Sequence, residues 1–426
     1  MAKAANNDDL KSAEQEVRRR LVELTGFEYA VFAPTGTAAF EVLLEVYSGR
    51  RSRVGVPALG CWTLPYAVTK LGRWVEFLDI DRYWGPVLPR GADLDVVMMF
   101  DPWGGPCDWD AARRRRGAQT WLLDLTHAPG ATLSGARPGE AFDGGIISFG
   151  GNKPLGLGGG GVALFNDPAA AREAIRLQRF GFRDGHWRRR IERYTYSPHL
   201  HPPLLRRLAR LSEDRSEKAF EVAAEVFADG LLEPIPLRPE GGRGWASVLA
   251  LQVPRSFPLS PRELEAVVVS SGQSLARYPV GPAYQEPAWG RRATAHCPRA
   301  ERLAPRLLFH TIRADVRSGL LALRALIEQV LLRPQAFRTP YVLPPPQGRL
   351  PPELIELQRT AFLVRTLSGD FGMIDEDFGM MIPVTPAEAA LLQARRPSPG
   401  AQAARPSRRS GAKAAKRSSR RGKGSP

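Results

Sequence analysis

Short apolar runs alternate with helix-compatible stretches over the first 170 residues of the chain. An amphipathic stretch comes first, because Leu10, Val17, Leu21 and Leu24 recur at helical spacing and Gly26 then ends the segment. Alternation of this kind predicts βαβ units, and therefore an α/β fold with a mostly parallel sheet flanked by helices. The predicted strands are Tyr29–Ala33, Val54–Val56, Val75–Ile80, Asp95–Phe100, Trp121–Leu125, Gly145–Phe149 and Val162–Phe165.

Two domains are predicted from this pattern. Residues 1–235 hold the N-terminal helix and the sheet, and we expect them to form a large domain. Residues 236–335 are predicted to form a smaller α+β domain, with a strand at Ala246–Val253 and helices at Pro261–Ser270 and Ser318–Leu332.

The remaining C-terminal sequence has a different composition. Residues 336–394 receive no role, because the run Pro340–Pro346 breaks regular structure and one stretch, Pro352–Leu367, fits a helix. Residues 395–426 are built almost entirely from Ala, Ser, Gly, Pro and basic residues, which cannot bury enough apolar surface to fold, so we predict a disordered basic tail.

Composition and cysteine spacing narrow the class of protein. A hydrophobic content of 43% and a charged content of 24% are typical of a soluble globular protein, and no apolar run approaches the ~18 residues of a membrane helix. The first residues lack the apolar core of a signal peptide, which predicts a cytoplasmic location. Cys61, Cys107 and Cys297 lie far apart, which argues against a disulfide framework and a zinc site.

The formal charge of +16 raises nucleic acid as a partner. Residues 395–426 carry eleven Lys or Arg and no acid, so the rest of the chain is only +5. Nucleic-acid contact is therefore predicted, if anywhere, through the tail.

Lys153 is the sole lysine between Lys70 and Lys218, in a chain that has eight lysines and relies on arginine for positive charge. It lies in a glycine-rich segment directly after the predicted strand Gly145–Phe149, where glycine lets the backbone approach a ligand closely. A pyridoxal-phosphate (PLP) enzyme needs such a lysine, whose amine binds the cofactor covalently and moves a substrate proton. A solvated lysine that contacts phosphate as a point charge is an equally favoured interpretation of this segment alone.

Asp124 ends the run Trp121–Asp124 of the predicted strand Trp121–Leu125 and precedes Lys153 by 29 residues. A buried aspartate can keep the nitrogen of a pyridine ring protonated, which makes the ring an effective electron sink. The commoner role of an aspartate after a strand is to cap a helix or a turn.

Two further segments suit a phosphate and a planar ring. Gly36 and Thr37 follow a strand and begin a helix, an arrangement in which backbone N–H groups and a hydroxyl bind phosphate. Trp62 could stack on a ring, although an aromatic residue in an apolar stretch more often belongs to the core.

In order and spacing, the chain resembles the DegT/StrS family of sugar aminotransferases, a branch of the PLP-dependent aspartate-aminotransferase superfamily of fold type I. The resemblance covers about residues 10–335 and is strongest through residue 166. The matching segments are Gly36–Ala39, Val56–Pro57, Phe77–Asp81, Trp103–Pro106 with Asp108, Leu123–Asp124, Ser148–Phe149, Lys153–Gly156, Gly160–Gly161, Arg277–Pro279, Pro282–Tyr284 and Ala300–Ala304.

The resemblance implies a role for each matching residue. Lys153 would be the Schiff-base lysine, Asp124 the partner of the pyridine nitrogen, and Trp62 the aromatic that stacks on the ring. Thr37 and Ser148 would contact the phosphate. His127 stands where the family usually has a glutamine near the phenolic oxygen of the cofactor. The resemblance also implies a homodimer with shared active sites.

The predicted reaction is transamination from an amino-acid donor to a keto compound such as a nucleotide-linked keto-sugar. Dehydratases of the family replace the lysine with histidine, so Lys153 favours an aminotransferase. Arg188–Arg190 and Arg193 could hold a diphosphate, although a solvated helix face is the favoured interpretation.

Two alternatives stay open. One is a PLP lyase on the same fold, and the other is a degenerate protein with a binding or regulatory role. The second is favoured by Gly159 and Thr195–Ser197, which depart from the family pattern, and opposed by the presence of both Asp124 and Lys153.

Overall fold

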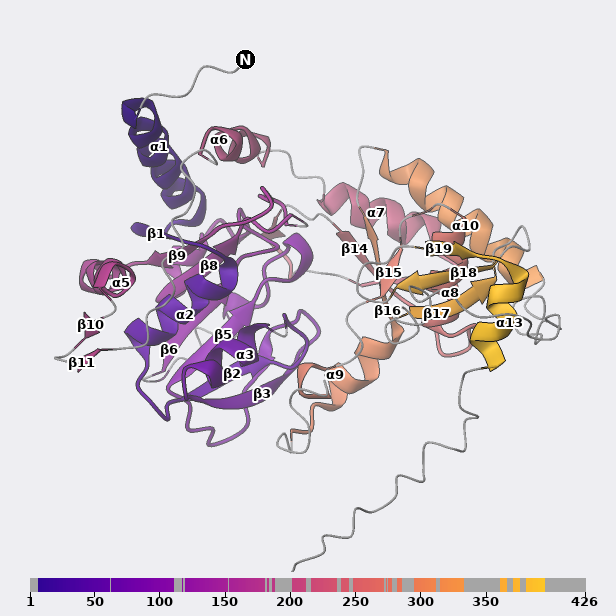
Figure 1. Ribbon diagram of the computed structural model, residues 1–426, viewed down its shortest axis with the longest axis horizontal. Helices are drawn as coiled ribbons and strands as arrows, with labels where there is room; N and C mark the ends of the chain where they lie inside the picture. Colours follow the sequence, from indigo (N-terminus) through magenta and orange to yellow (C-terminus); the bar gives the residue numbers. More distant parts are fainter. Residues whose placement is uncertain are drawn as a thin grey trace, which may run out of the picture. The chain divides into compact units, whose positions relative to one another are not determined.

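The computed structural model divides into two compact units, Met1–Pro340 and Tyr341–Pro426, whose elements are labelled in Figure 1. Among the described residues, no helix combines the length and the apolar character needed to cross a membrane. The structure describes residues 7–394 with gaps at 62, 111–116, 118, 152, 181, 184–185, 188–200, 212–215, 236–238, 245–247, 272, 274, 278–281, 286–294, 312–314, 333–360, 366–370 and 376–380.

Eight strands of the first unit form one sheet. They are β1 (Tyr29–Ala33), β2 (Arg53–Pro57), β3 (Trp74–Ile80), β4 (Pro86–Val87), β5 (Val96–Phe100), β6 (Thr120–Asp124), β8 (Gly144–Ser148) and β9 (Gly161–Phe165). Their order is β1-β9-β8-β6-β5-β2-β3-β4. All pairs from β8 to β3 are parallel, whereas β9 runs antiparallel to both neighbours and β4 runs antiparallel to β3. The predicted α/β class with a mostly parallel sheet is therefore confirmed, and each predicted strand coincides with an observed one to within a residue or two.

Apolar cores lie on both faces of this sheet. Strand β5 shows why, because Val96 and Met98 belong to one core and Val97 and Met99 to the other, as the alternation of side chains along a strand requires. The first core is covered by α2 (Gly36–Tyr47), α3 (Thr63–Lys70) and α5 (Pro168–Phe180), and the second by α1 (Asn7–Thr25) and α6 (His201–Arg210).

Gly26 ends α1 as predicted. Its φ is +75°, a conformation that favours glycine, and its N–H donates to the carbonyl oxygen of Val22.

A smaller antiparallel sheet follows in the first unit, with the order β12-β14-β16-β15. Its strands are β12 (Glu233–Pro234), β14 (Val248–Gln252), β15 (Ala276–Arg277) and β16 (Leu307–Thr311), and its helices are α7 (Ser216–Val226), α8 (Pro261–Ser270) and α10 (Val316–Leu332). Ala223 of α7 shares a core with Leu251 and Leu323, so this core begins before residue 236. The boundary at residues 235 and 236 stays a prediction.

Short elements complete the first unit. The two-stranded pairs are β7 (Thr132–Leu133) with β13 (Gly242–Arg243), and β10 (Phe182–Arg183) with β11 (His186–Trp187). The other helices are η1 (Pro102–Gly104), η2 (Pro138–Glu140), η4 (Ala283–Gln285), α9 (Pro298–Leu303) and η6 (Ala304–Arg306).

The second unit contains regular structure that the sequence pattern did not reveal. Strands β17 (Ala361–Arg365), β18 (Phe371–Asp375) and β19 (Met381–Val384) form an antiparallel sheet, and α13 (Pro386–Ala394) follows. The prediction of a helix at Pro352–Leu367 is wrong from residue 361 to residue 365, because these residues pair with β18. The apolar side chains of that stretch fit both the period of a helix and the alternation of a strand. The basic tail at 395–426 lies outside the described residues.

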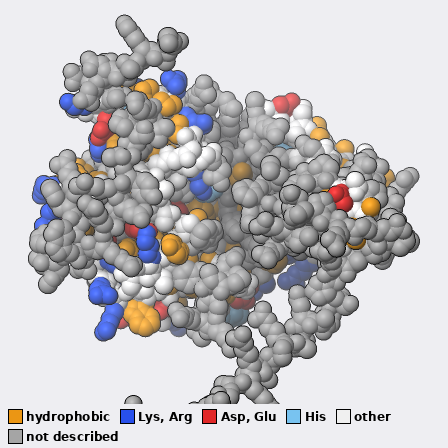
Figure 2. Space-filling view, viewed as in Figure 1, with side chains coloured by type: hydrophobic (Ala, Val, Ile, Leu, Met, Phe, Trp, Pro, Cys, Tyr) orange, Lys and Arg blue, Asp and Glu red, His pale blue; other side chains and the backbone are white. Residues whose placement is uncertain are grey.

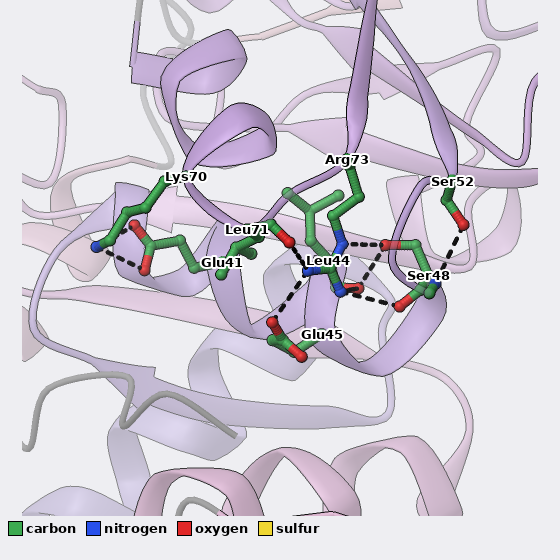
Figure 3. Close-up of polar contacts among 9 residues, drawn as sticks. Glu41, Leu44, Glu45, Ser48, Ser52, Lys70, Leu71 and Arg73 are labelled. Carbon is green, nitrogen blue, oxygen red and sulfur yellow. Dashed lines mark hydrogen bonds and ion pairs between the residues drawn. The ribbon is translucent and has the colours of Figure 1, made fainter. Parts of the chain in front are cut away.

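A buried arginine fixes the C-terminal end of α2 (Figure 3). The side chain of Arg73 is 1% exposed, and its Nη1 lies 3.0 Å from Oε1 of Glu45. The same guanidinium donates to the carbonyl oxygens of Leu44, Ser48 and Leu71. The network joins α2 to the turn between α3 and β3, and so holds in place a helix whose other end lies at the candidate site.

Replacing Arg73 with methionine is expected to lower the free energy of unfolding by about 3–5 kcal/mol, because Glu45 would keep a buried charge without its partner. Urea denaturation measures this. The matched control is Arg53→Met, since the pair of Arg53 with Glu76 is exposed by 44% and 43% and its loss should cost below about 1 kcal/mol. Equal losses in the two variants would show that the buried network is not what stabilises this region.

Candidate active site

The carboxyl ends of three parallel strands bring the candidate residues together. Phe100 pairs with Asp124, and Asp124 pairs with Ile146, so the ends of β5, β6 and β8 lie along one edge of the sheet. The loops that leave this edge contain His127 and Lys153. Ligands of parallel α/β sheets bind at such an edge.

Asp124 is the last residue of β6 and is 1% exposed. Its Oδ1 accepts a hydrogen bond of 2.9 Å from the backbone N–H of Thr126. Burial raises the pKa of Asp124, while the Thr126 hydrogen bonds and the positive charge of Lys153 oppose that rise. The site therefore holds a desolvated carboxyl within electrostatic reach of the lysine.

Lys153 sits in a tight loop that glycines make possible. Its backbone N–H donates to the carbonyl oxygen of Gly150 at 2.9 Å, and its own carbonyl oxygen accepts from the N–H of Gly156 at 2.8 Å. A Cβ atom on Gly156 would lie 2.4 Å from the Gly150 oxygen, which only glycine avoids. The N–H groups of Leu157 and Gly159 both donate to the Phe149 carbonyl oxygen and close the loop onto β8.

The amine of Lys153 contacts His127, with 2.7 Å between Nζ and Nε2. Burial holds the pKa of His127 well below its usual value, and the charge of Lys153 lowers it further, so the imidazole is neutral. An ammonium group has only donors, so Nε2 accepts and the ring proton lies on Nδ1. The ring also packs edge-on against Phe100, at 5.7 Å between centroids.

The start of α2 and the end of β8 form the candidate phosphate cradle. A Cβ atom on Gly36 would lie 2.8 Å from Cβ of Ser148, so this glycine allows the N-terminus of α2 to meet the end of β8. The N–H of Gly160 donates to the Pro34 carbonyl oxygen, so the glycine-rich segment after Lys153 also lies beside the start of α2. The helix cap is Thr35, whose Oγ1 accepts from Ala38 N–H, and Thr37 is half-buried in the first turn. Backbone N–H groups at the start of a helix suit an anion.

Some predicted residues cannot be placed. Trp62, Arg188–Arg190, Arg193 and Thr195–Ser197 lie outside the described residues. The structure thus brings together Asp124, His127 and Lys153, and places Gly36 and Ser148 side by side.

Asp101 is a residue that the sequence pattern missed. It follows β5, is fully buried, and its Oδ1 accepts from Cys107 N–H at 2.8 Å and Trp109 Nε1–H at 2.9 Å. Its Oδ2 has no hydrogen-bond partner among the described residues. Burial above all, with a contribution from the charge of Asp124, raises the pKa of Asp101 to about 7. The fact that it directly follows a buried strand, as Asp124 ends one, was the signal available in the sequence.

Asp101→Asn is expected to change how stability depends on pH. Because the pKa is about 7 in the folded protein against an ordinary 3.8, the folded state keeps a proton that the unfolded state releases between these values. The free energy of unfolding of the wild type should therefore fall by roughly 4 kcal/mol from pH 4 to pH 8 because of the Asp101 carboxyl. Asp101→Asn has no carboxyl at this position and should not show that fall. Urea denaturation at both pH values measures it, and parallel stability curves for the two proteins would refute the assignment.

Comparison with known proteins supports a family assignment. A UDP-N-acetyl-3-dehydro-α-D-glucosamine 3-aminotransferase of Acidithiobacillus ferrooxidans is 25% identical over 320 residues, which cover 70% of this chain and 83% of that protein. Among solved structures, DesI with its TDP-sugar product has a TM-score of 0.66 at 20% identity, covering 76% of this chain and 86% of DesI. Spr1654 of Streptococcus pneumoniae in its PLP form has a TM-score of 0.63 at 19% identity, covering 75% and 92%.

The family model that matches residues 5–316 describes the DegT/DnrJ/EryC1/StrS aminotransferase family. This match spans most of the chain, and the likeness to DesI and Spr1654 shows the same fold. The chain belongs to the DegT/DnrJ/EryC1/StrS aminotransferase family, whose members depend on PLP.

Proposed function

We propose that this protein is an aminotransferase that binds PLP through Lys153 and transfers an amino group from an amino-acid donor to a keto-sugar linked to a nucleotide. The observation that carries the proposal is the amine of Lys153 beside His127 and within electrostatic reach of the buried Asp124, at the ligand-binding edge of the sheet. A solvated surface lysine would have neither neighbour.

The residues present suit PLP. A buried carboxyl at the end of β6 suits the ring nitrogen, and an amine on a glycine loop suits the aldehyde carbon. The first turn of α2, beside Ser148, offers N–H donors and a hydroxyl for the phosphate. When bound, PLP supplies an electron sink for the bond that breaks at the amino-bearing carbon of the substrate.

The residues would divide the tasks. Asp124 would hold a proton on the ring nitrogen. The Nζ atom of Lys153 would hold the cofactor and would also move the proton of the amino-bearing carbon of the substrate. Neutral His127 accepts a hydrogen bond from Nζ and orients it between these two tasks.

The substrate class rests on relatives. The Acidithiobacillus protein is named for a UDP-linked keto-sugar, and DesI was crystallised with a TDP-sugar product. A GDP-perosamine synthase of Caulobacter vibrioides, 28% identical over 180 residues that cover 38% of this chain and 46% of that protein, adds a third nucleotide. A nucleotide-linked keto-sugar is therefore the acceptor that we propose.

The test combines a spectrum with a half-reaction. Purified protein with PLP should show an absorption band near the visible edge, and borohydride reduction followed by peptide mapping should place the label on Lys153. Addition of L-glutamate should then release 2-oxoglutarate without any acceptor. A label on another lysine would refute the site. Cleavage of a carbon–carbon bond of an amino acid, or elimination that yields ammonia together with a keto acid, would instead support a lyase.

The degenerate binding protein is favoured by the departures from the family pattern at Gly159 and Thr195–Ser197 and opposed by the presence of Asp124 and Lys153. On the face drawn in Figure 2, the described Lys and Arg side chains lie in several separate groups rather than in one patch. The homodimer and the cytoplasmic location stay predictions, and sedimentation of the PLP-loaded protein measures the first.

A further inference from the structure

A hollow of about 210 Å³ lies between the loop that follows β14 and the helical stretch formed by α9 and η6. Arg299, Arg302, Leu303 and Arg306 occupy positions i, i+3, i+4 and i+7, so they share one face of this stretch. The other face contributes Ala300 and Ala304 to the apolar core. The described lining consists of Gln252, Arg255, Arg299, Arg302, Leu303 and Arg306, which means four guanidinium groups and no carboxylate.

The acidic side chains near this arginine hollow accept hydrogen bonds from groups other than its guanidiniums. Glu301, on α9 itself, accepts from the hydroxyl of Tyr284 on the side away from the arginine face. Asp79 accepts from the backbone N–H groups of Arg299 at 3.0 Å and Ala300 at 2.9 Å. Glu233, next to the hollow, accepts from the amide of Gln252. Each carboxylate is thus bonded to a group other than a guanidinium of the hollow.

The four arginines of the hollow differ from other arginines of the chain in their ion pairs with carboxylates. Arg73, Arg317 and Arg324 each pair with a carboxylate, whereas the described residues include no ion pair to any arginine of the hollow. Guanidinium groups cannot shed their protons, and like charges three residues apart destabilise a helix. A helical stretch this short therefore holds three positive charges on one face. None of them forms an ion pair with a described residue, and Asp81 acts on Arg299 from a distance.

Hydrogen bonds hold the backbone around the hollow in place. Arg306 Nε donates to the carbonyl oxygen of Val253 at 2.7 Å, and Val253 N–H donates back to the carbonyl oxygen of Arg306 at 2.9 Å. These bonds join η6 to the end of β14, while Asp79 of β3 holds the start of α9. The backbone would therefore need little ordering on binding, whereas the exposed side chains of Arg255, Arg299 and Arg302 would become ordered.

We propose that the arginine hollow is a second ligand site, which binds a small anion bearing a diphosphate group. The planar fork of a guanidinium matches two phosphate oxygens at once, and several such forks around one hollow favour a diphosphate over a monophosphate. A hollow of about 210 Å³ admits that group, and Leu303 offers an apolar surface to what it is attached to. The site shares no residue with the one around Lys153.

The test is a calorimetric titration of inorganic diphosphate into the PLP-loaded protein, whose cofactor keeps diphosphate out of the cradle at α2. Diphosphate is expected to bind at least tenfold more tightly than monophosphate, and its affinity should fall as NaCl rises from 0.05 to 0.3 M (about 14 Å to 6 Å in screening length). Absence of binding in 0.05 M NaCl would overturn the proposal.

Variants locate the binding. Arg302→Gln and Arg255→Gln, one on each wall, should each weaken diphosphate binding at least tenfold with unchanged thermal midpoints. Arg172→Gln is the matched control, because Arg172 is exposed on α5 and makes no ion pair with a described residue. Equal weakening in the control would overturn the site, as would capture of a single-stranded oligonucleotide through Arg302 without any binding of diphosphate.

Discussion

Lys153→Ala is expected to abolish covalent attachment of PLP and to lower the rate of transamination by about 10³-fold or more. The variant loses both the amine that holds the cofactor and the base that moves the substrate proton, and residues that act in one step do not substitute for each other. Alanine fits the loop, because the backbone N–H and carbonyl of Lys153 make the bonds to Gly150 and Gly156 and the side chain does not. The measurements are the absorption band, the borohydride label, and the rate of the glutamate half-reaction.

The matched control is His127→Gln, which places the usual family residue at the end of the contact with Nζ and leaves the lysine in place. Glutamine also offers an acceptor, so the label on Lys153 should remain and the rate should fall by about tenfold or less. If Lys153→Ala kept the absorption band, the covalent assignment would be wrong. If His127→Gln lost the label as Lys153→Ala does, the imidazole would have a larger role than orienting the amine.

The central sheet could be predicted because burial on both faces leaves a strong pattern. The runs at Val96–Phe100 and Gly161–Phe165 are buried at every position, and each is bounded by residues that break strands. In a parallel sheet, ligands bind at the carboxyl ends of the strands. Asp124 and Lys153 follow such strand ends in the sequence, so they could be named before their surroundings were known. Their proximity could not, because 29 residues separate them in the sequence.

Residues defined by tertiary contacts escaped prediction. The position of Asp101 after a buried strand is visible in the sequence, but its raised pKa depends on the burial of the β5 end, a tertiary feature, as does its bond to Trp109. Arg255 and Arg302 converge only because β14 and α9 meet. In the second unit, Ala361–Arg365 is a strand because β18 pairs with it, which a periodicity within one segment does not show.

Asp124→Asn is expected to lower the transamination rate by about 10³-fold while the label on Lys153 persists. Asparagine keeps an oxygen that can accept the Thr126 N–H but carries no negative charge, so the ring nitrogen would lose the group that keeps it protonated. Attachment depends on Nζ and on the aldehyde carbon, so the spectrum should shift without the label disappearing. Rates of the half-reaction measured beside label yield separate these two effects.

Asp101→Asn is the control for Asp124→Asn, because both carboxyls are buried at the ends of neighbouring strands and both substitutions remove one acid. Asp101 accepts hydrogen bonds from Cys107 and Trp109, and the amide oxygen of asparagine can accept the same bonds. No contact between Asp101 and the cofactor is proposed. Asp101→Asn should therefore keep the transamination rate within about tenfold of the wild-type rate. Its free energy of unfolding should no longer fall as the pH rises toward 8. Equal rate losses in the two variants would show that the essential charge is not specific to Asp124. The charge of Asp124 raises the pKa of Asp101, so the two carboxyls are close enough for such a result to be meaningful.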